Sequence, residues 1–205
     1  MNQEDSVNDQ SLTQQNILGS IYARHSVRAY APTPIDDTVL STLLDAAVHA
    51  PTAMHEEPWA FVIVQDRQLL QRLSDIAKPI FIEEASRRQA HEATHSFGHF
   101  AQTDFNIFHG AGTLIIICTR QQGPFVVADC WLAAENLMLA ADASGLGTCV
   151  IGSAVSALNA HKKELGLPDE YYAVAPIVVG VPSGEIKVTS RNKPVILSWK
   201  KQHNL

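Results

Sequence analysis

The chain has 205 residues, of which 46% are hydrophobic and 18% charged, proportions that are ordinary for a globular protein. Its 15 basic and 21 acidic residues give a net charge of −6, which excludes a general electrostatic attraction to nucleic acid. No apolar run is long enough to span a membrane, so we expect no membrane partner.

The cysteines and the N-terminus both favour a cytoplasmic protein. Cys118, Cys130 and Cys149 lack CxxC spacing and stand in apolar surroundings, as reduced, buried thiols do. Residues 1–16 are polar and do not resemble a secretory signal. We expect residues 1–10 to be a flexible tail and residues 11–205 to form a single domain, because neither a linker nor an internal repeat divides them.

Two amphipathic helices are predicted in the first quarter of the chain. Apolar residues recur at helical spacing over residues 11–23. A second stripe follows Asp36, a favoured N-cap residue, and Pro51 ends it. Two prolines between these segments prevent one continuous helix.

Strand-like segments occupy residues 58–64, 113–118 and 173–180, with a shorter one at 148–151. The run 113–118 is apolar without alternation, which predicts a central strand covered on both faces. Pro176 has no N–H to donate, so it predicts either an edge position or a bulge.

Further helices are predicted over residues 69–77, 129–144 and 154–165, which gives an α/β or α+β chain with a sheet between helices. The helix 129–144 is apolar nearly all round and should be buried. Trp131, Leu132, Met138 and Leu139 cover more than one of its faces, which favours a dimer. Near the C-terminus, residues 195–199 form an apolar segment, which we expect to pack against another surface.

The polar, histidine-rich segment 83–109 predicts one or two helices over the core, or a lid. Within it, His91, Glu92 and His95 satisfy the H-E-x-x-H signature of zinc hydrolases. The extended signature requires a third histidine where this chain has Ala101, and the surrounding sequence is polar rather than apolar. A solvated segment is the simpler interpretation, and a zinc hydrolase is kept as an alternative.

Residues 23–30 place two guanidinium groups on either side of a hydroxyl at alternate positions. In an extended segment, Arg24, Ser26 and Arg28 would share one face, and this donor set suits a phosphate or a polar ring edge. Taken alone, such a short basic pattern is more often an ordinary surface loop.

Four separated segments change this interpretation: Arg24-His25-Ser26-Val27-Arg28, residues 50–61, residues 145–152 and Arg191-Asn192-Lys193-Pro194. In this order and at these separations they resemble the nitroreductase family, over nearly the whole chain. The resemblance implies an α+β fold around a central mixed sheet flanked by helices. It also implies an intertwined homodimer with one FMN in each of two interface clefts.

Within this resemblance, Arg24, Ser26 and Arg28 would hold the FMN phosphate and the pyrimidine edge of the flavin ring. Arg191 and Lys193 would add positive charge at the phosphate.

The remaining expected contacts lie around the flavin ring. Pro51, Thr52 and Met54 would come from the partner chain, and the backbone of Gly152 and Ser153 would donate an N–H to flavin N5. The expected set of cofactor-binding residues is completed by His25, His55 and Ile151.

Two positions depart from the family, which commonly has Asn and Gln where this chain has His55 and Glu57. A carboxylate facing the flavin would lower its reduction potential, whereas both side chains could instead point into solvent.

The predicted activity is ping-pong transfer of electrons from NADH or NADPH to a flat, electron-poor small molecule such as a nitroaromatic or a quinone. In this mechanism FMN carries the hydride and no catalytic side chain is needed. The alternatives are a specialised flavin reaction (reductive dehalogenation or flavin cleavage) and a non-catalytic flavin carrier.

Overall fold

The computed structural model describes residues 17–88, 100, 102, 104–120, 123–184 and 189–201. Four strands form one sheet in the order β1 (Trp59–Val64), β2 (Thr113–Thr119), β4 (Tyr172–Gly180) and β3 (Gly147–Val150). Every neighbouring pair of these strands is antiparallel. The parallel component expected of a mixed sheet is present in the described chain as an isolated bridge between Ser26 and Thr148.

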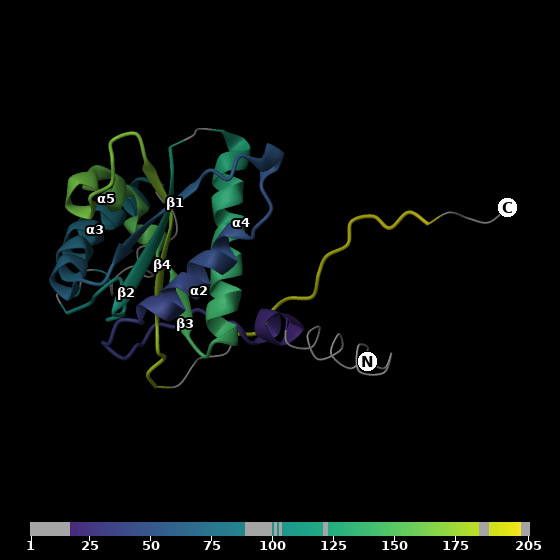
Figure 1. The fold of residues 1–205 in the computed structure, drawn as a ribbon, viewed down its shortest axis with the longest axis horizontal. Helices are drawn as coiled ribbons and strands as arrows, with labels where there is room; N and C mark the ends of the chain where they lie inside the picture. The colour runs from purple at the N-terminus through teal and green to yellow at the C-terminus, as the bar shows by residue number, and fades with distance from the viewer. Residues whose placement is uncertain are drawn as a thin grey trace.

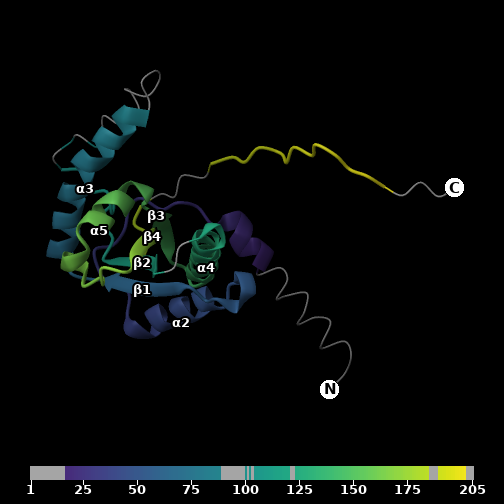
Figure 2. The ribbon, with the colours of Figure 1, turned by 90° about the horizontal axis from the view of Figure 1, so that it is seen from above.

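Helices cover both faces of this sheet (Figure 1 and Figure 2). α2 (Asp37–Val48) and α4 (Pro124–Ala143) lie on one face, and α3 (Arg67–Arg88) and α5 (Val155–Ala160) lie on the other. Alternation along β2 explains the arrangement, because successive side chains of a strand point to opposite faces. Leu114 and Ile116 face α3 and α5, whereas Ile115 and Ile117 face α2 and α4.

The α+β class predicted from the sequence is therefore confirmed, and β2 is the central strand covered on both faces. The helix after Asp36 is confirmed as α2, since the Asp36 carboxylate accepts from the Val39 N–H at 2.9 Å. The first predicted helix is confirmed for residues 17–23, whereas its earlier part and the predicted tail 1–10 lie outside the described residues.

The edge position considered for Pro176 is wrong, because β4 lies between β2 and β3. The bulge alternative is confirmed two residues away, where Val174 is left without a register partner on β2. The carbonyl of Pro176 accepts from Ile151 at 2.8 Å, just beyond the last residue of β3. The N–H and C=O of a strand residue point toward the same neighbouring strand. The N–H that Pro176 lacks would therefore face the chain just beyond β3, where the ladder of β3 has already ended.

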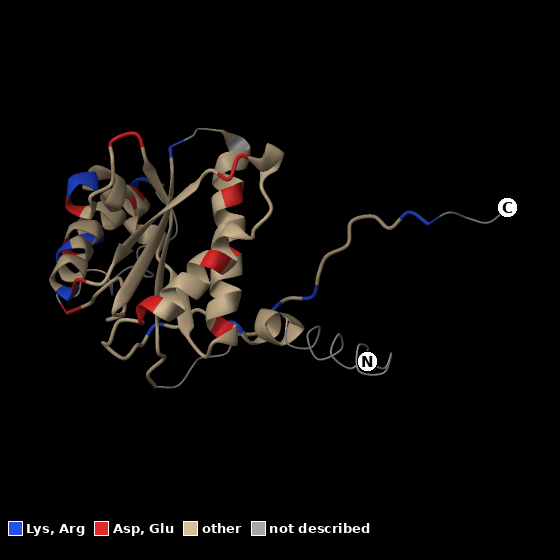
Figure 3. Cartoon of the chain, in the orientation of Figure 1, with Lys and Arg blue, Asp and Glu red and all other residues tan. Residues whose placement is uncertain are grey.

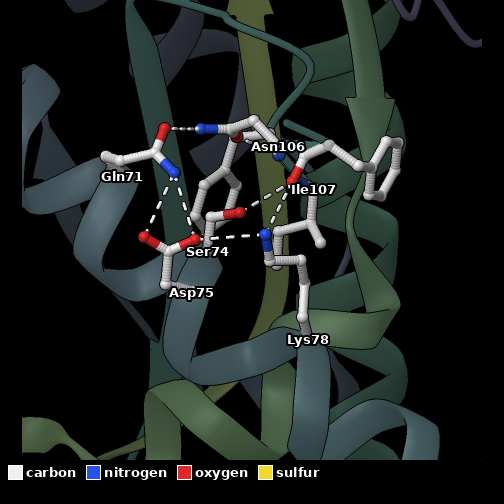
Figure 4. Close-up of polar contacts among 8 residues, drawn as sticks. Gln71, Ser74, Asp75, Lys78, Asn106 and Ile107 are labelled. Atoms are coloured by element: carbon white, nitrogen blue, oxygen red, sulfur yellow. Dashed lines mark hydrogen bonds and ion pairs between the residues drawn. The ribbon is translucent and has the colours of Figure 1, made fainter. Parts of the chain in front are cut away.

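α3 extends beyond the predicted short helix 69–77, since it has 22 residues and contains Pro79. A polar cluster ties this helix to the segment before β2 (Figure 4). The Ser74 hydroxyl accepts from the Ile107 N–H at 3.0 Å, and Lys78 donates to the Phe105 carbonyl at 3.0 Å. Lys78 also pairs with Asp75 at 3.1 Å.

For residues 83–109 the sequence predicted either one or two helices over the core or a lid. In the described parts of that segment the helix alternative holds for residues 83–88, and the lid is wrong. Residues 83–88 continue α3, and Ile107 and Phe108 are buried in the core beside it. The predicted helix 154–165 is broken at His161 into α5 and the 3-10 turn η4 (Lys162–Leu165).

The C-terminal segment 189–201 extends away from the body of the molecule (Figure 1). Its four large apolar side chains are exposed, Leu197 to 94%. The docking expected of this segment is thus not made within the described chain. The prediction of one domain over residues 11–205 stays a prediction. No described helix combines the length and the apolarity needed to cross a membrane.

Candidate functional site

The segment 24–30 is extended and lies against β3. Its Val27 N–H donates to the Thr148 carbonyl at 2.9 Å, and the Tyr30 hydroxyl donates to the Val27 carbonyl at 2.7 Å. Val27 and Tyr30 are buried, whereas Ser26 and Arg28 are exposed. A Cβ at Gly147 would come within 3 Å of Val27, so this close approach requires a glycine.

The three predicted polar side chains of this segment share one neighbour, Cys149 on β3. Burial raises the pKa of the Cys149 thiol, while the charges of Arg28 and Arg24 and a hydrogen bond with Ser26 act in the opposite direction. All three side chains therefore lie near enough to Cys149 to act on its thiol, and two guanidinium groups with a hydroxyl are donors that suit an anionic group.

Arg24 also contacts Glu135 of α4, a residue that the sequence analysis did not select. Its Nε lies 3.6 Å from the Glu135 carboxylate, and the Arg24 side chain is 21% exposed. This partly exposed pair contributes little stability, but it fixes one guanidinium against α4. His25 contacts the Ala23 carbonyl through Nδ1, so its ring is held by the chain just before it.

The chain just after β3 has backbone N–H groups that could bind a ligand. Ile151 precedes the 3-10 turn η3 (Gly152–Ala154), and the first N–H groups of such a turn have no partner within it. A Cβ built on Gly152 would meet nothing within 4 Å. Four residue steps separate Thr148 from Gly152, so their Cα atoms lie at most about 14 Å apart. A flat molecule can thus approach the backbone at Gly152 while its other end lies near Ser26.

The loop 51–57, which contains the 3-10 turn η1 (Ala53–His55), has a strained backbone. Met54, His55 and Glu57 adopt positive φ angles of 54°, 58° and 41°. Such angles cost roughly 1–2 kcal/mol for a residue with a side chain, so the surroundings must hold the loop in this shape. Pro51 and His55 are exposed, and Met54 is 92% exposed.

Asp129 of α4 holds this loop, and the sequence analysis missed it as well. Its carboxylate is buried and accepts the Ala53 N–H at 3.2 and 3.3 Å. The available signal was a carboxylate in the most apolar helix of the sequence, but Glu135 and Asp142 of the same helix give that signal too. Only the burial of Asp129, which requires a partner for its charge, distinguishes it from them.

The single chain does not bring all the predicted site residues together. Arg24, Ser26 and Arg28 gather beside β3, but no described contact joins them to the loop 51–57. Arg191 and Lys193 are exposed on the C-terminal segment, where Arg191 donates to the carbonyl and hydroxyl of Thr189 at 3.1 Å.

The charges around the candidate site are unevenly distributed (Figure 3). Acidic residues gather along α2, α4 and the loop between α2 and β1, whereas basic residues lie along α3 and on η4. An anion bound beside α4 therefore depends on Arg24 and Arg28 rather than on the charge of its surroundings.

The residues of the zinc alternative, His91, Glu92 and His95, lie outside the described residues. In the part of the chain that the structure does describe, no group of three or more His, Cys, Asp or Glu side chains is arranged to hold a metal ion.

Comparison with known proteins gives a consistent result. The model of the nitroreductase family matches residues 21–181. A relative from Archaeoglobus fulgidus, provisionally named an NADH dehydrogenase/NAD(P)H nitroreductase, is 27% identical over 83% of this chain and 88% of its own. A Bacteroides fragilis nitroreductase solved with bound FMN is 25% identical, with a TM-score of 0.76 over 90% of this chain and 98% of its own. A nitroreductase with bound FMN from Desulfitobacterium hafniense, 20% identical, shares the fold with a TM-score of 0.74 over 86% of this chain and 94% of its own.

Proposed function

The chain belongs to the nitroreductase family, and from this premise we propose that it is an FMN-dependent oxidoreductase that uses NADH or NADPH. The placement of Arg24, Ser26 and Arg28 on one segment that lies against β3 carries the proposal, because this donor set suits a phosphate group. The FMN bound to the Bacteroides fragilis nitroreductase, which aligns with nearly all of this chain, supports the same cofactor here.

The residues present fit the cofactor in two respects. A phosphate dianion is best held by forked, permanently charged donors, which Arg24 and Arg28 supply, with a hydroxyl donor from Ser26. Arg191 and Lys193 would add positive charge once the C-terminal segment docks. The absent side chain at Gly152 leaves open space beside free backbone donors, which suits a flat ring.

When bound, FMN supplies the redox chemistry: it accepts a hydride from the nicotinamide and passes both electrons to an acceptor that then takes the nicotinamide's place. The protein's part is to bind and orient. Gly152 and Ser153 would present backbone N–H groups to flavin N5, and no acid or base side chain would be required. Ping-pong kinetics follow because donor and acceptor use one position in turn.

The site is complete only in a homodimer. The exposed apolar side chains Val195, Ile196, Leu197 and Trp199 need a partner surface, and the chain offers one. An apolar hollow of about 770 Å³ lies between the helical residues 17–23, the end of α2 and α4. On α4, Trp131 and Leu132 are also exposed, 38% and 45%. We infer that a second copy covers this side and brings its loop 51–57, with Thr52 and Met54, to the flavin.

The acceptors we propose are flat, electron-poor small molecules such as nitroaromatics and quinones. The positions of His55 and Glu57 bear on this range. Both are exposed on the loop that would face the partner's flavin, so a carboxylate rather than an amide would stand near the ring. A negative charge there disfavours reduced, anionic flavin and lowers its potential.

Absorption spectroscopy tests the proposal. Protein loaded with FMN should be yellow, should bleach under argon with NADH or NADPH, and should recover its colour when a quinone or nitroaromatic is added. Steady-state rates should give parallel double-reciprocal lines. Protein that cannot bind added FMN would refute the proposal, and bound FMN that stays yellow with both nicotinamides would identify a carrier. Dehalogenated or flavin-cleavage products from a substrate panel would identify the specialised reactions.

A further inference from the structure

Two halves of the proposed site are held to α4 by carboxylates that lie six residues apart. Glu135 contacts Arg24 of the phosphate-binding segment, and Asp129 accepts the Ala53 N–H of the loop 51–57. The two carboxylates differ in exposure, because the Glu135 side chain is half exposed whereas Asp129 is only 5% exposed. A carboxylate this buried needs a donor, and Ala53 supplies it.

The anchored residue occupies the centre of the loop. Ala53 lies directly between Thr52 and Met54, the two side chains proposed to line the flavin ring of the partner subunit. It also immediately precedes the strained pair Met54 and His55, whose positive φ angles aim the loop outward. A loop released from Asp129 would relax these angles and move the ring-facing side chains.

We propose that Asp129 is a positioning residue for the cofactor site: by accepting the Ala53 N–H it holds the loop 51–57 in the shape that meets the flavin across the dimer interface. This inference rests on the proposed function. Asp129 need not touch the flavin, because it acts through the backbone of Ala53.

The hydrogen bond can be removed from either end. Asp129→Leu removes the acceptor and replaces it with an apolar side chain of similar size. Ala53→Pro removes the donor and leaves α4 unchanged. Thr52 already has φ −129° and ψ 148°, the extended conformation that a residue before proline requires. Asp129→Asn keeps an oxygen that can accept the same N–H, and it serves as the conservative rescue.

A variant that leaves both the loop 51–57 and α4 unchanged separates positioning from general destabilisation. Asn159 of α5 makes a paired hydrogen bond to Ala173, accepting its N–H at 2.9 Å and donating to its carbonyl at 3.0 Å. Asn159→Leu therefore weakens the fold on the opposite face of the sheet from α4. Its effect on the dissociation constant of FMN shows how much a loss of folding stability alone weakens binding.

The first measurement is the dissociation constant of FMN for each variant, by fluorescence titration. We expect Asp129→Leu and Ala53→Pro each to weaken binding about tenfold, the value of one charged hydrogen bond. Their combination should add little to either, since both remove the same contact. Asp129→Asn and Asn159→Leu should stay within about threefold of the wild type. Additive effects, or equal weakening by Asn159→Leu or Asp129→Asn, would overturn the inference.

The second measurement does not depend on the cofactor. Hydrogen exchange of residues 51–57 in the FMN-free protein should speed up in Asp129→Leu and stay slow in Asp129→Asn and Asn159→Leu. Unchanged exchange in Asp129→Leu would overturn the anchoring itself. If the wild-type protein binds no FMN and the variants still show this exchange pattern, the proposed function is refuted but the anchoring of the loop by Asp129 is supported.

Discussion

The sheet with its helical layers and the C-terminal segment 189–201 differ in how they place apolar side chains. The strand β2 is completely buried, because each of its faces meets helices of the same chain. The C-terminal segment leaves Val195 and Leu197 at 85% and 94% exposure. Burial of such side chains is the main source of folding stability, so the first region is complete in one chain, whereas the second has no covering surface within the described chain.

Loss of the C-terminal segment should have the largest effect. A chain ending at Gly184 should keep the far-UV circular dichroism of the body but become monomeric in light scattering. Its affinity for FMN should fall by at least about a hundredfold, since two cations and the partner's loop are lost together. A matched variant with serine at positions 195, 196, 197 and 199 keeps Arg191 and Lys193. If that variant stays dimeric, the apolar side chains are not what joins the subunits.

Arg24→Met should give the next largest effect, which should be confined to the affinity for FMN. The substitution keeps the length of the apolar stem but removes a charged donor at the phosphate. FMN affinity should fall roughly 10- to 100-fold, the value of one or two charge-assisted hydrogen bonds. Arg72→Met on α3, an exposed arginine far from the site, is the control. An unchanged dissociation constant for Arg24→Met would contradict the assigned phosphate site.

Ile115→Ala tests the body of the molecule. Ile115 is fully buried between β2 and the α2–α4 layer, so the cavity left behind should cost about 3 kcal/mol of the free energy of unfolding. The loss should appear in chemical denaturation at every protein concentration. A loss that vanishes at high concentration would mean that the dimer, and not the sheet, holds this region together.

Asp36→Ala should have the smallest effect, about 1 kcal/mol, because it removes one N-cap hydrogen bond of α2. The measurement is the midpoint of thermal unfolding, with Asp36→Asn as the variant that retains a capping oxygen. Equal losses in both variants would show that the charge of Asp36, and not its hydrogen bond to Val39, stabilises the helix.

Local patterns predicted the elements of the body well. Asp36 marked the start of α2, and the apolar run at 113–118 identified β2 as central, because both signals arise from neighbours in the sequence. The same reasoning failed for Pro176, whose place inside the sheet depends on where β3 ends, far away in the chain. It also made α3 too short, since Pro79, which usually ends or kinks a helix, lies inside it.

The sequence by itself determined the family and the cluster of Arg24, Ser26 and Arg28, because alternation in an extended segment is a local property. Only the tertiary structure decided which carboxylates of α4 hold the site. Glu135 and Asp129 lie 111 and 76 positions from their partners Arg24 and Ala53, and their roles follow from the packing of α4. No local pattern encodes which buried acid meets which backbone N–H, since that match forms only when the layers close around the sheet.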